Sequence, residues 1–465
     1  MKNLKLVLAI TLAALLLVAR PVAAQSMLRD AETERFLRDI TTPILEAAGL
    51  TPENVNIYLV YDNSLNAFVT GGQNIFIHTG LLLRTETVEQ LQGVIAHETG
   101  HIAAGHLRRR DEGARGASRM SILSMVLGVA AIAAGSGDAG MGILAAGQGM
   151  AQRTYLKYNR GQESAADQAG ASYLEASEIS GRGLIEFFEI LRYEELNRGI
   201  KQDEYVRSHP LNADRMNALQ YTVDASPYVD TPTNPDWAAR LKKVQGKLIG
   251  YVRTPQETFT TYPLSDTSIE ARYARAYAYH RSLDWDKALA EIDAMISEDP
   301  LSPYYYEIKG QILVENHKVE QSIPVLKKAV EMAPKEPLIL TAYGQALVAS
   351  ENPKHLAEAR KVLEFATAVD RENTFGFYNL AIVYTNIGKQ SLASLATAER
   401  YNVMGNARFA VMHANIALNG LKEYTPQWLR AQDILYINQA VAEKQEREEK
   451  KKRRRDERGL TFSSS

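Results

Sequence analysis

Two histidines and a glutamate in the run HETGH, residues 97–101, have the types and spacing that metal-dependent hydrolysis requires. On an α-helix, residues four positions apart project from one face, so the imidazoles of His97 and His101 can bind the same metal ion. Glu98 lies about 100° around the helix from His97, where its carboxylate can take a proton from a water molecule beside the metal. This H-E-x-x-H arrangement is typical of zinc peptidases, so we predict one Zn²⁺ per chain and hydrolysis of peptide bonds.

The residues around this motif are apolar or small. Val94 and Ile95 precede it, and the uncharged run IAAG follows at residues 102–105. Such a helix is expected to be buried, where two histidines need partners. Thr87 and Gln90 offer a capping box at its start. The alternative is a solvent-exposed helix that carries two histidines by chance.

A catalytic zinc ion needs a third protein ligand and keeps one position open for water. The chain has no cysteine, and Leu107 stands where a metzincin would carry a third histidine. His106 lies about half a turn from His97 on an ideal helix, so we expect a polar surface residue there. Glu163 is the better candidate, with Asp167 one helical turn later in a segment of small residues. Glu163 can bind zinc while Asp167 accepts a hydrogen bond from a ligand histidine, although such an acidic pair alone is more often solvated surface.

A third cluster, SHP at residues 208–210, is followed by Arg215. Proline disfavours helical conformation for the residue before it. His209 is therefore expected on a loop or in the segment that leads into a helix. His209 can donate a hydrogen bond to the oxyanion of the tetrahedral intermediate, or fill the fourth zinc position and block water. Arg215 can bond a carboxylate of the zinc site or polarise the carbonyl oxygen. The remaining alternative is a helix-capping turn followed by a surface arginine.

Together these motifs resemble those of the gluzincin metallopeptidases, the family that includes HtpX and the CAAX-processing proteases. The resemblance is strong through Arg215 and looser in the carboxyl-terminal repeats. Its specific elements are HETGH at 97–101, ESAAD at 163–167, SHP at 208–210 and NAFVTGG at 66–72. His209 matches the family's switch histidine, which coordinates zinc and holds the enzyme inactive.

The resemblance also implies roles for the other residues of the site. Three of them would be zinc ligands, namely His97, His101 and Glu163. Glu98 would be the catalytic base. Asp167 would be a supporting acid, a residue that is sometimes assigned as the proton donor in this family.

The amino terminus has the features of a secretory signal peptide. Lys2 and Lys5 precede a largely apolar run at residues 6–19, and small residues before Gln25 predict cleavage after Ala24. The run is shorter than the roughly 20 residues that span a bilayer. We therefore predict removal of residues 1–24 and a periplasmic protein that is soluble or peripherally membrane-associated. The formal net charge of −2 gives no reason to expect a nucleic-acid partner.

We predict a mainly α-helical fold in several parts. A helical zinc metallopeptidase domain with a small β-sheet covers residues 25–223, and a connector covers 224–267. Strand-like segments at residues 55–60 and 74–78 suggest a small antiparallel sheet beside the motif helix. The second segment is the expected edge strand on which an extended substrate pairs, through Asn74, Ile75, Phe76, Ile77 and His78.

Residues 118–152 of this domain are unusually apolar. Two apolar arms, at residues 120–134 and 139–151, flank GSGD at 135–138. Each arm is shorter than the roughly 20 residues that cross a bilayer, so we expect a hairpin of two helices. Three roles stay open for it: it covers the cleft, leans on a membrane surface or forms core.

A 34-residue period marks the rest of the chain as an α-solenoid of tetratricopeptide repeats at residues 268–440. The recurring pairs are Ala288 and Ser322, Ile292 and Leu326, Met295 and Ala329, Pro300 and Pro334, and Gly310 and Gly344. A third unit follows after a three-residue insertion. Such arrays bind peptides or proteins. The charged tail, residues 441–465, is expected to be a solvated, fraying helix end that is disordered for most of its length.

Two functions remain open at this point. By the resemblance, the first is a periplasmic zinc endopeptidase that degrades misassembled outer-membrane β-barrel proteins and aids their assembly. Its repeats would contact unfolded outer-membrane proteins or the β-barrel assembly machinery. The second is a chaperone or assembly scaffold whose peptidase site is silent. The intact motifs favour the first function. However, His209 in the fourth zinc position would silence the peptidase site of the resting protein, as the second function requires.

Overall fold

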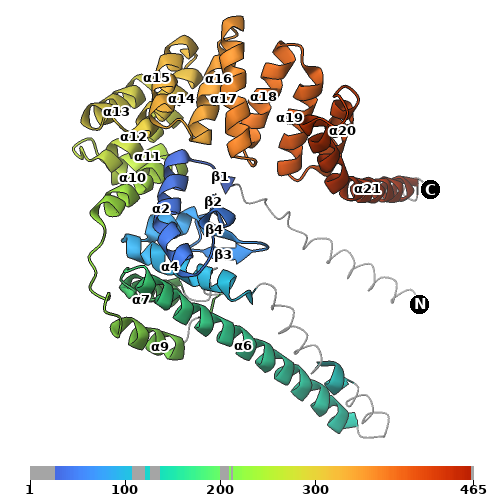
Figure 1. The fold of residues 1–465 in the computed structure, drawn as a ribbon. Helices are drawn as coiled ribbons and strands as arrows, with labels where there is room; N and C mark the ends of the chain where they lie inside the picture. The colour runs from blue at the N-terminus through green and yellow to red at the C-terminus, as the bar shows by residue number, and fades with distance from the viewer. Residues whose placement is uncertain (1–26, 107–120, 126–136, 199–208, 211–212, 462–465) are drawn as a thin grey trace. The chain divides into compact units, whose positions relative to one another are not determined.

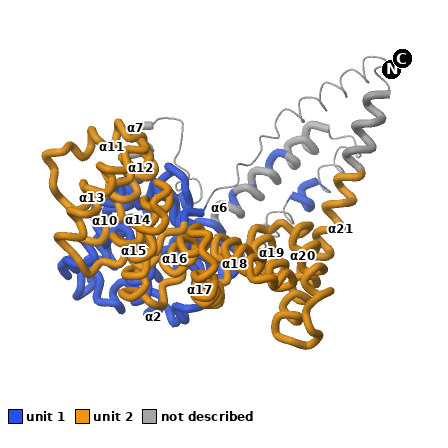
Figure 2. The backbone as a smooth tube through the Cα atoms, turned by 90° about the horizontal axis from the view of Figure 1, so that it is seen from above, with its two compact units in different colours: residues 1–28, 37–238 blue, residues 29–36, 239–465 orange. Residues whose placement is uncertain are grey.

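The computed structural model describes residues 27–106, 121–125, 137–198, 209–210 and 213–461 (Figure 1). The predicted signal peptide lies outside them. The chain divides into two compact units, which Figure 2 colours separately. Unit 1 holds the residues up to Leu28 and Leu37–Ala238, and unit 2 holds Arg29–Phe36 and everything from Ala239 onward. The chain thus changes unit three times, and two of these changes fall within helices.

A four-stranded sheet lies in unit 1. Its strands are β1 (Met27–Leu28), β2 (Asn56–Val60), β3 (Ala67–Thr70) and β4 (Asn74–His78), in the order β1-β2-β4-β3. β2 and β4 run parallel, while β3 and β4 are antiparallel. The expected antiparallel pairing of residues 55–60 with 74–78 is therefore wrong, because β3 reverses the chain between these two strands.

The prediction of a substrate-pairing edge strand at residues 74–78 is also wrong. β4 lies between β2 and β3, so the main chain of Asn74, Ile75, Phe76, Ile77 and His78 is paired on both sides. Ile75 and Ile77 are fully buried, as expected of a central strand. Among the described strands, the sheet ends at β1 and β3, whose outer edges carry the unpaired main-chain groups.

Helices complete unit 1, and α4 packs against two of them, α6 and α7. The described elements are α2 (Ala31–Ala47, which begins in unit 2), η1 (Pro52–Asn54), α3 (Thr79–Arg84), α4 (Val88–Ala103), α6 (Gly137–Ala176), α7 (Arg182–Arg198) and α9 (Ala213–Asp224).

Helix α6 contains two segments that the sequence pattern predicts to be separate. The second apolar arm, at residues 139–151, and the ESAAD segment at 163–167 belong to one continuous helix. Of the first arm, residues 121–125 are helical and the others lie outside the described residues. Within the described parts of the chain, no helix combines the length and apolar character that spanning a membrane requires.

Unit 2 is built from helices that stack as antiparallel pairs (Figure 1). They are α10 (Pro235–Val252, which begins in unit 1), α11 (Pro255–Thr261), α12 (Ile269–Arg281), α13 (Trp285–Glu298), α14 (Pro303–Glu315), α15 (Val319–Met332), α16 (Pro337–Ala349), α17 (Leu356–Val369), α18 (Thr374–Asn386), α19 (Gln390–Val403), α20 (Ala407–Leu418) and α21 (Pro426–Thr461). The prediction of a mainly helical chain with a small sheet and a helical-repeat array is confirmed.

The recurring glycines explain the 34-residue period. A Cβ atom at Gly310 would lie 2.3 Å from the Leu326 side chain, and one at Gly344 would lie 2.5 Å from Leu363. Each glycine therefore lets the leucine of the paired helix pack against the backbone. The three-residue insertion before the third unit forms a short 3-10 turn, η2 (Pro353–His355).

The charged tail differs from its prediction. Helix α21 continues to Thr461, which agrees with the expected helix end, whereas the expectation of disorder is wrong over residues 441–461. Ion pairs four residues apart, Glu443 with Arg447 and Glu446 with Lys450, explain the difference, because they support an exposed helix.

Candidate metal centre

Helix α4 carries the HETGH motif in a buried position. His97 and Glu98 have no exposed surface, which confirms the expected burial. Thr87 caps the helix by accepting a hydrogen bond from the Gln90 backbone N–H. The Gln90 side chain accepts one from the backbone N–H of Glu86 instead of Thr87, so the predicted capping box is present only in part.

Small residues let α4 and α6 approach closely. A Cβ atom at Gly100 would lie 2.8 Å from the carbonyl oxygen of Ala166, and one at Gly170 would lie 3.1 Å from the α4 backbone. Both helices therefore meet with almost no side chain between them. This close contact brings Glu163 and Asp167, one turn apart on α6, against the histidines of α4.

Four side chains converge at this contact. Ligand atoms of His97, His101, Glu163 and His209 all lie within 4.8 Å of one another. His97 Nε2 is 3.1 Å from His101 Nε2 and 3.2 Å from His209 Nδ1, which is 2.9 Å from Glu163 Oε2. Ligands about 2.0–2.1 Å from a tetrahedral zinc ion are about 3.3 Å apart, so both the spacing and the nitrogen and oxygen donors fit this metal.

Asp167 orients the first histidine of the motif. Its Oδ1 accepts a hydrogen bond of 2.9 Å from His97 Nδ1, which leaves His97 Nε2 facing the cluster. Burial raises the pKa of Asp167, but hydrogen bonds from Arg215 and His97 outweigh it and hold this pKa below its usual value. Burial lowers the pKa of His97, yet its contacts with Asp167 and Glu163 raise it to about 10.

Arg215 links Pro210, the residue after His209, to Asp167 on α6. Its Nε and Nη2 donate to the two oxygens of Asp167 at 2.7 and 2.8 Å, and its Nη1 donates to the Pro210 carbonyl at 2.6 Å. The side chain is buried, which excludes the alternative of a surface arginine. Its guanidinium thus donates hydrogen bonds both to the Asp167 carboxylate and to the main-chain carbonyl of Pro210.

Glu98 is a buried carboxylate of the α4 helix. Among the described residues, neither of its carboxylate oxygens has a hydrogen-bond partner. His209 Nε2 lies 3.5 Å from Glu98 Oε1. Burial raises the pKa of Glu98. The charges of His209 and His97 act in the opposite direction but do not cancel this rise. A buried carboxylate with two unused oxygens beside a metal-ligand cluster is suited to accept a proton.

His106 is not the surface residue that the sequence analysis expects. It is 8% exposed, and its Nδ1 lies 2.9 Å from His101 Nδ1. Helix α4 ends at Ala103, so an ideal-helix projection does not apply to residue 106. Gly105, with a φ of +64°, turns the chain after the helix. A glycine just past a helix end is the sequence signal that could have indicated this turn.

The fold and the site together define a metallopeptidase. Residues 31–223 match the model of Peptidase family M48. The matched residues include His97, His101, Glu163 and His209, and the chain is a metalloprotease.

Curated relatives extend the similarity beyond this domain. The chain is 22% identical over 396 residues to the beta-barrel assembly-enhancing protease of Yersinia pestis, covering 84% of this chain and 80% of the relative. It is 21% identical over 404 residues to the protein of that name from Escherichia coli, covering 85% and 81%. Metalloprotease YcaL of Escherichia coli is 30% identical over 173 residues, which are 37% of this chain and 62% of that protein.

One solved structure is also similar to part of the chain. The structure titled "Crystal structure of YrrB: a TPR protein with an unusual peptide-binding site" aligns with a TM-score of 0.31 and 18% identity. The alignment covers 38% of this chain and 91% of the chain in the YrrB structure.

Proposed function

We propose that the protein is a zinc endopeptidase of the bacterial periplasm that acts on misassembled outer-membrane proteins. The observation that carries the proposal is the convergence of His97, His101, Glu163 and His209 within 4.8 Å. His97, His101 and Glu163 would hold the ion, since each comes from a helix that packing keeps rigid. Zn²⁺ held there would supply a Lewis acid that activates water for attack on a peptide carbonyl.

Glu98 is the catalytic base in this proposal. Its unused oxygens let it accept the proton that the attacking water loses and pass this proton to the leaving amine. Asp167 is assigned as a positioning residue instead of a proton donor. Both of its oxygens already accept hydrogen bonds, and its lowered pKa keeps it ionised.

His209 is assigned as a fourth ligand that closes the resting site. Its Nδ1 lies among the ligand atoms, at 2.9 Å from Glu163 Oε2, and its Nε2 points toward Glu98. In this position the imidazole excludes the water that Glu98 must deprotonate. Displacement of His209 would open the site, so hydrolysis requires this side chain to leave the ligand cluster.

An extended substrate would pair with β3. This strand ends the sheet on the side of α4, which it contacts. Pairing through main-chain groups selects unfolded segments, because a folded protein has no free strand to offer. The names of the similar proteases support outer-membrane β-barrel proteins as the substrate class.

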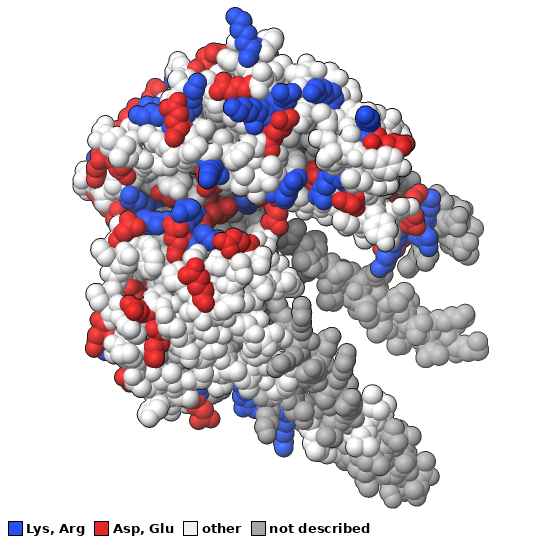
Figure 3. Space-filling view, viewed as in Figure 1, with Lys and Arg blue, Asp and Glu red and all other residues white. Residues whose placement is uncertain are grey.

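Unit 2 is proposed to recruit substrate or the assembly machinery. Phe409, Met412 and Ile416 form an exposed apolar stripe on α20, and Tyr436 and Ile437 are exposed on α21. Exposed apolar stripes of this kind commonly mark protein-binding surfaces. Figure 3 shows that acidic and basic side chains are interspersed on the visible face of the repeats, which suits protein partners.

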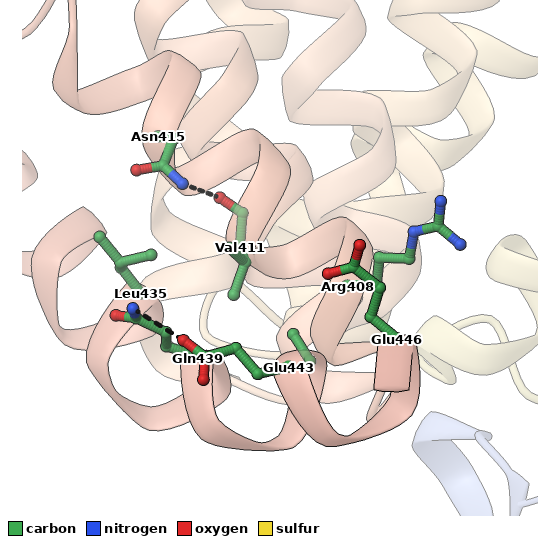
Figure 4. A pocket seen from close by; sticks show the side chains of 8 residues that line it. Arg408, Val411, Asn415, Leu435, Gln439, Glu443 and Glu446 are labelled. Atoms are coloured by element: carbon green, nitrogen blue, oxygen red, sulfur yellow. Dashed lines mark hydrogen bonds between the residues drawn. The ribbon is translucent and has the colours of Figure 1, made fainter. Parts of the chain in front are cut away.

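Two cavities lie near this surface. One of about 600 Å³ is bordered by α17, α18, α19 and the start of α21. The other, of about 310 Å³, lies between α20 and α21 and is lined by Arg408, Glu443 and Glu446 at one end (Figure 4). They offer room for side chains of a bound segment.

Zinc content and proteolysis, measured together, test the proposal. Protein lacking residues 1–24 should carry about one zinc per chain and degrade an unfolded β-barrel protein. Glu98→Gln should keep the zinc and lose proteolysis, because only the base is removed. His209→Ala should keep the zinc and raise basal proteolysis. A wild-type protein without zinc would refute the metal site, and unchanged proteolysis in Glu98→Gln would refute the assigned base.

The second candidate function is a chaperone or assembly scaffold with a silent peptidase site. The position of His209 in the ligand cluster favours it for the resting protein. A Glu98→Gln variant that still supports β-barrel assembly fully in cells would favour this function over proteolysis.

A further inference from the structure

The two histidines of the motif receive different support. His97 Nδ1 bonds to the Asp167 carboxylate at 2.9 Å, whereas His101 Nδ1 bonds to His106 Nδ1 at 2.9 Å. In both residues the other nitrogen, Nε2, faces the ligand cluster. The orientation of each ligand ring is therefore fixed by a hydrogen bond at its Nδ1.

The hydrogen bond between His101 and His106 restricts the tautomers of both rings. A histidine that binds a metal through Nε2 is neutral and carries its proton on Nδ1. His101 then donates this proton to His106 Nδ1, which must be the unprotonated nitrogen of a neutral ring. The ring planes are 71° apart with centroids 5.0 Å from each other, an edge-on arrangement that suits such a bond.

The backbone places His106 where this bond can form. Helix α4 ends at Ala103, and the N–H groups of Ala104 and Gly105 bond back to Gly100 and Ile102. Gly105 adopts a left-handed φ of +64°, which turns the chain back toward the helix. His106 follows this turn directly and is buried with only 8% of its surface exposed.

We infer that His106 is a positioning residue of the metal site, which fixes the ring orientation and tautomer of His101. The inference rests on the proposed function, because it requires His101 to bind the ion through Nε2. Hydrogen-bond partners of ligand histidines typically contribute about 10–100-fold to metal affinity. His106 does so without a negative charge, in contrast to Asp167 behind His97.

Competition with a chromophoric zinc chelator, on the full chain lacking residues 1–24, tests the inference. His106→Leu fills similar space without an acceptor and should bind zinc about 10–100-fold more weakly than wild type. His106→Asn places its amide oxygen near the former Nδ1 and should restore most of the affinity. The visible spectrum of bound Co²⁺ should change in His106→Leu and return toward wild type in His106→Asn.

Two controls separate this role from a general loss of stability. His355→Leu removes a histidine that bonds to Ser350 in unit 2 and should leave zinc affinity unchanged. Thermal unfolding without metal should be similar for His106→Leu and His106→Asn, so that their difference in affinity reflects the acceptor.

The outcomes distinguish the inference from the proposed function. If wild-type protein binds no zinc, the proposed function fails and the inference fails with it. If wild type binds zinc and His106→Leu binds it equally tightly, the inference alone is overturned. Equal weakening in His106→Leu and His106→Asn would also overturn it, because packing and not the hydrogen bond would then be responsible.

Discussion

At the scale of single residues, Asp167 joins His97, a proposed zinc ligand, to the buried Arg215. Asp167→Asn retains an oxygen for His97 but removes the charge that pairs with Arg215. We expect zinc affinity to fall about 10–100-fold, since the partner of a ligand histidine is weakened. The free energy of unfolding should fall by roughly 1–3 kcal/mol, because the buried guanidinium loses the nearer of two carboxylate partners and keeps Glu163, whose Oε2 lies 3.5 Å from Nη1. Chelator competition and urea unfolding measure the two effects.

Asp214→Asn is the matched control. Asp214 is an exposed acid next to Arg215, and its replacement should leave both quantities within about 0.5 kcal/mol of wild type. The assignment of Asp167 as a positioning residue is contradicted if Asp167→Asn binds zinc normally and loses only turnover. That result would return Asp167 to the role of proton donor.

At the scale of elements, the contact between α4 and α6 depends on glycine. A Cβ atom at Gly100 would lie 2.8 Å from the Ala166 carbonyl oxygen. Gly100→Ala must therefore move the two helices apart, which separates Glu163 from the histidines. We expect a loss of about 1–3 kcal/mol in stability, as for other overpacked cores, and a clear loss of zinc affinity.

Gly161→Ala is the matched control on the same α6 helix. A Cβ atom at Gly161 would meet nothing within 4 Å, so the variant should be as stable as wild type or gain up to about 1 kcal/mol from helix propensity. Equal behaviour of the two alanine variants in thermal unfolding and zinc binding would contradict a tight contact between these helices.

The outer edge of β3 gives a second matched pair. Asn66 O accepts from His78 N, and the alternation of an antiparallel ladder then turns the main chain of Phe68 toward β4 and that of Val69 away from it. Val69→Pro should leave the sheet intact and raise KM for an unfolded substrate. Phe68→Pro removes a ladder hydrogen bond and should lower stability by several kcal/mol, roughly 3 or more. An unchanged KM in Val69→Pro would exclude substrate pairing at this edge.

The sequence predicted which side chains lie close together in the candidate site better than it predicted the strand order of the sheet. The spacing within HETGH and ESAAD indicates which helix faces carry the ligands, because a helical period is a local property. Strand order is not local: β3 is a four-residue segment, Ala67–Thr70, and its pairing decides that β4 is central. His106 was missed for a related reason, since its position depends on the turn at Gly105 and not on the period of α4.

At the scale of the whole molecule, the segment Arg29–Phe36 completes unit 2 although it lies in the sequence between β1 and β2 of the unit 1 sheet. Within unit 2, the buried Lys247 on α10 forms ion pairs with Asp30 and with Glu32, which lies 3.5 Å away. Tyr273 donates a further hydrogen bond of 2.7 Å to Glu32. A fragment that begins at residue 239 would retain Lys247 and lose both acids.

Replacing Lys247 tests how much this cluster stabilises the repeats. Lys247→Met removes the cation that pairs with the partly buried Asp30 and the buried Glu32, so the free energy of unfolding should fall by up to roughly 3–5 kcal/mol in urea titrations followed by circular dichroism. Adding Asp30→Asn and Glu32→Gln removes the unpaired charges and should recover most of this loss. Lys243→Met, one turn earlier and only 3.9 Å from Asp299, should cost no more than about 1 kcal/mol. A Lys247→Met protein as stable as Lys243→Met would mean that the amino-terminal acids do not hold unit 2 together.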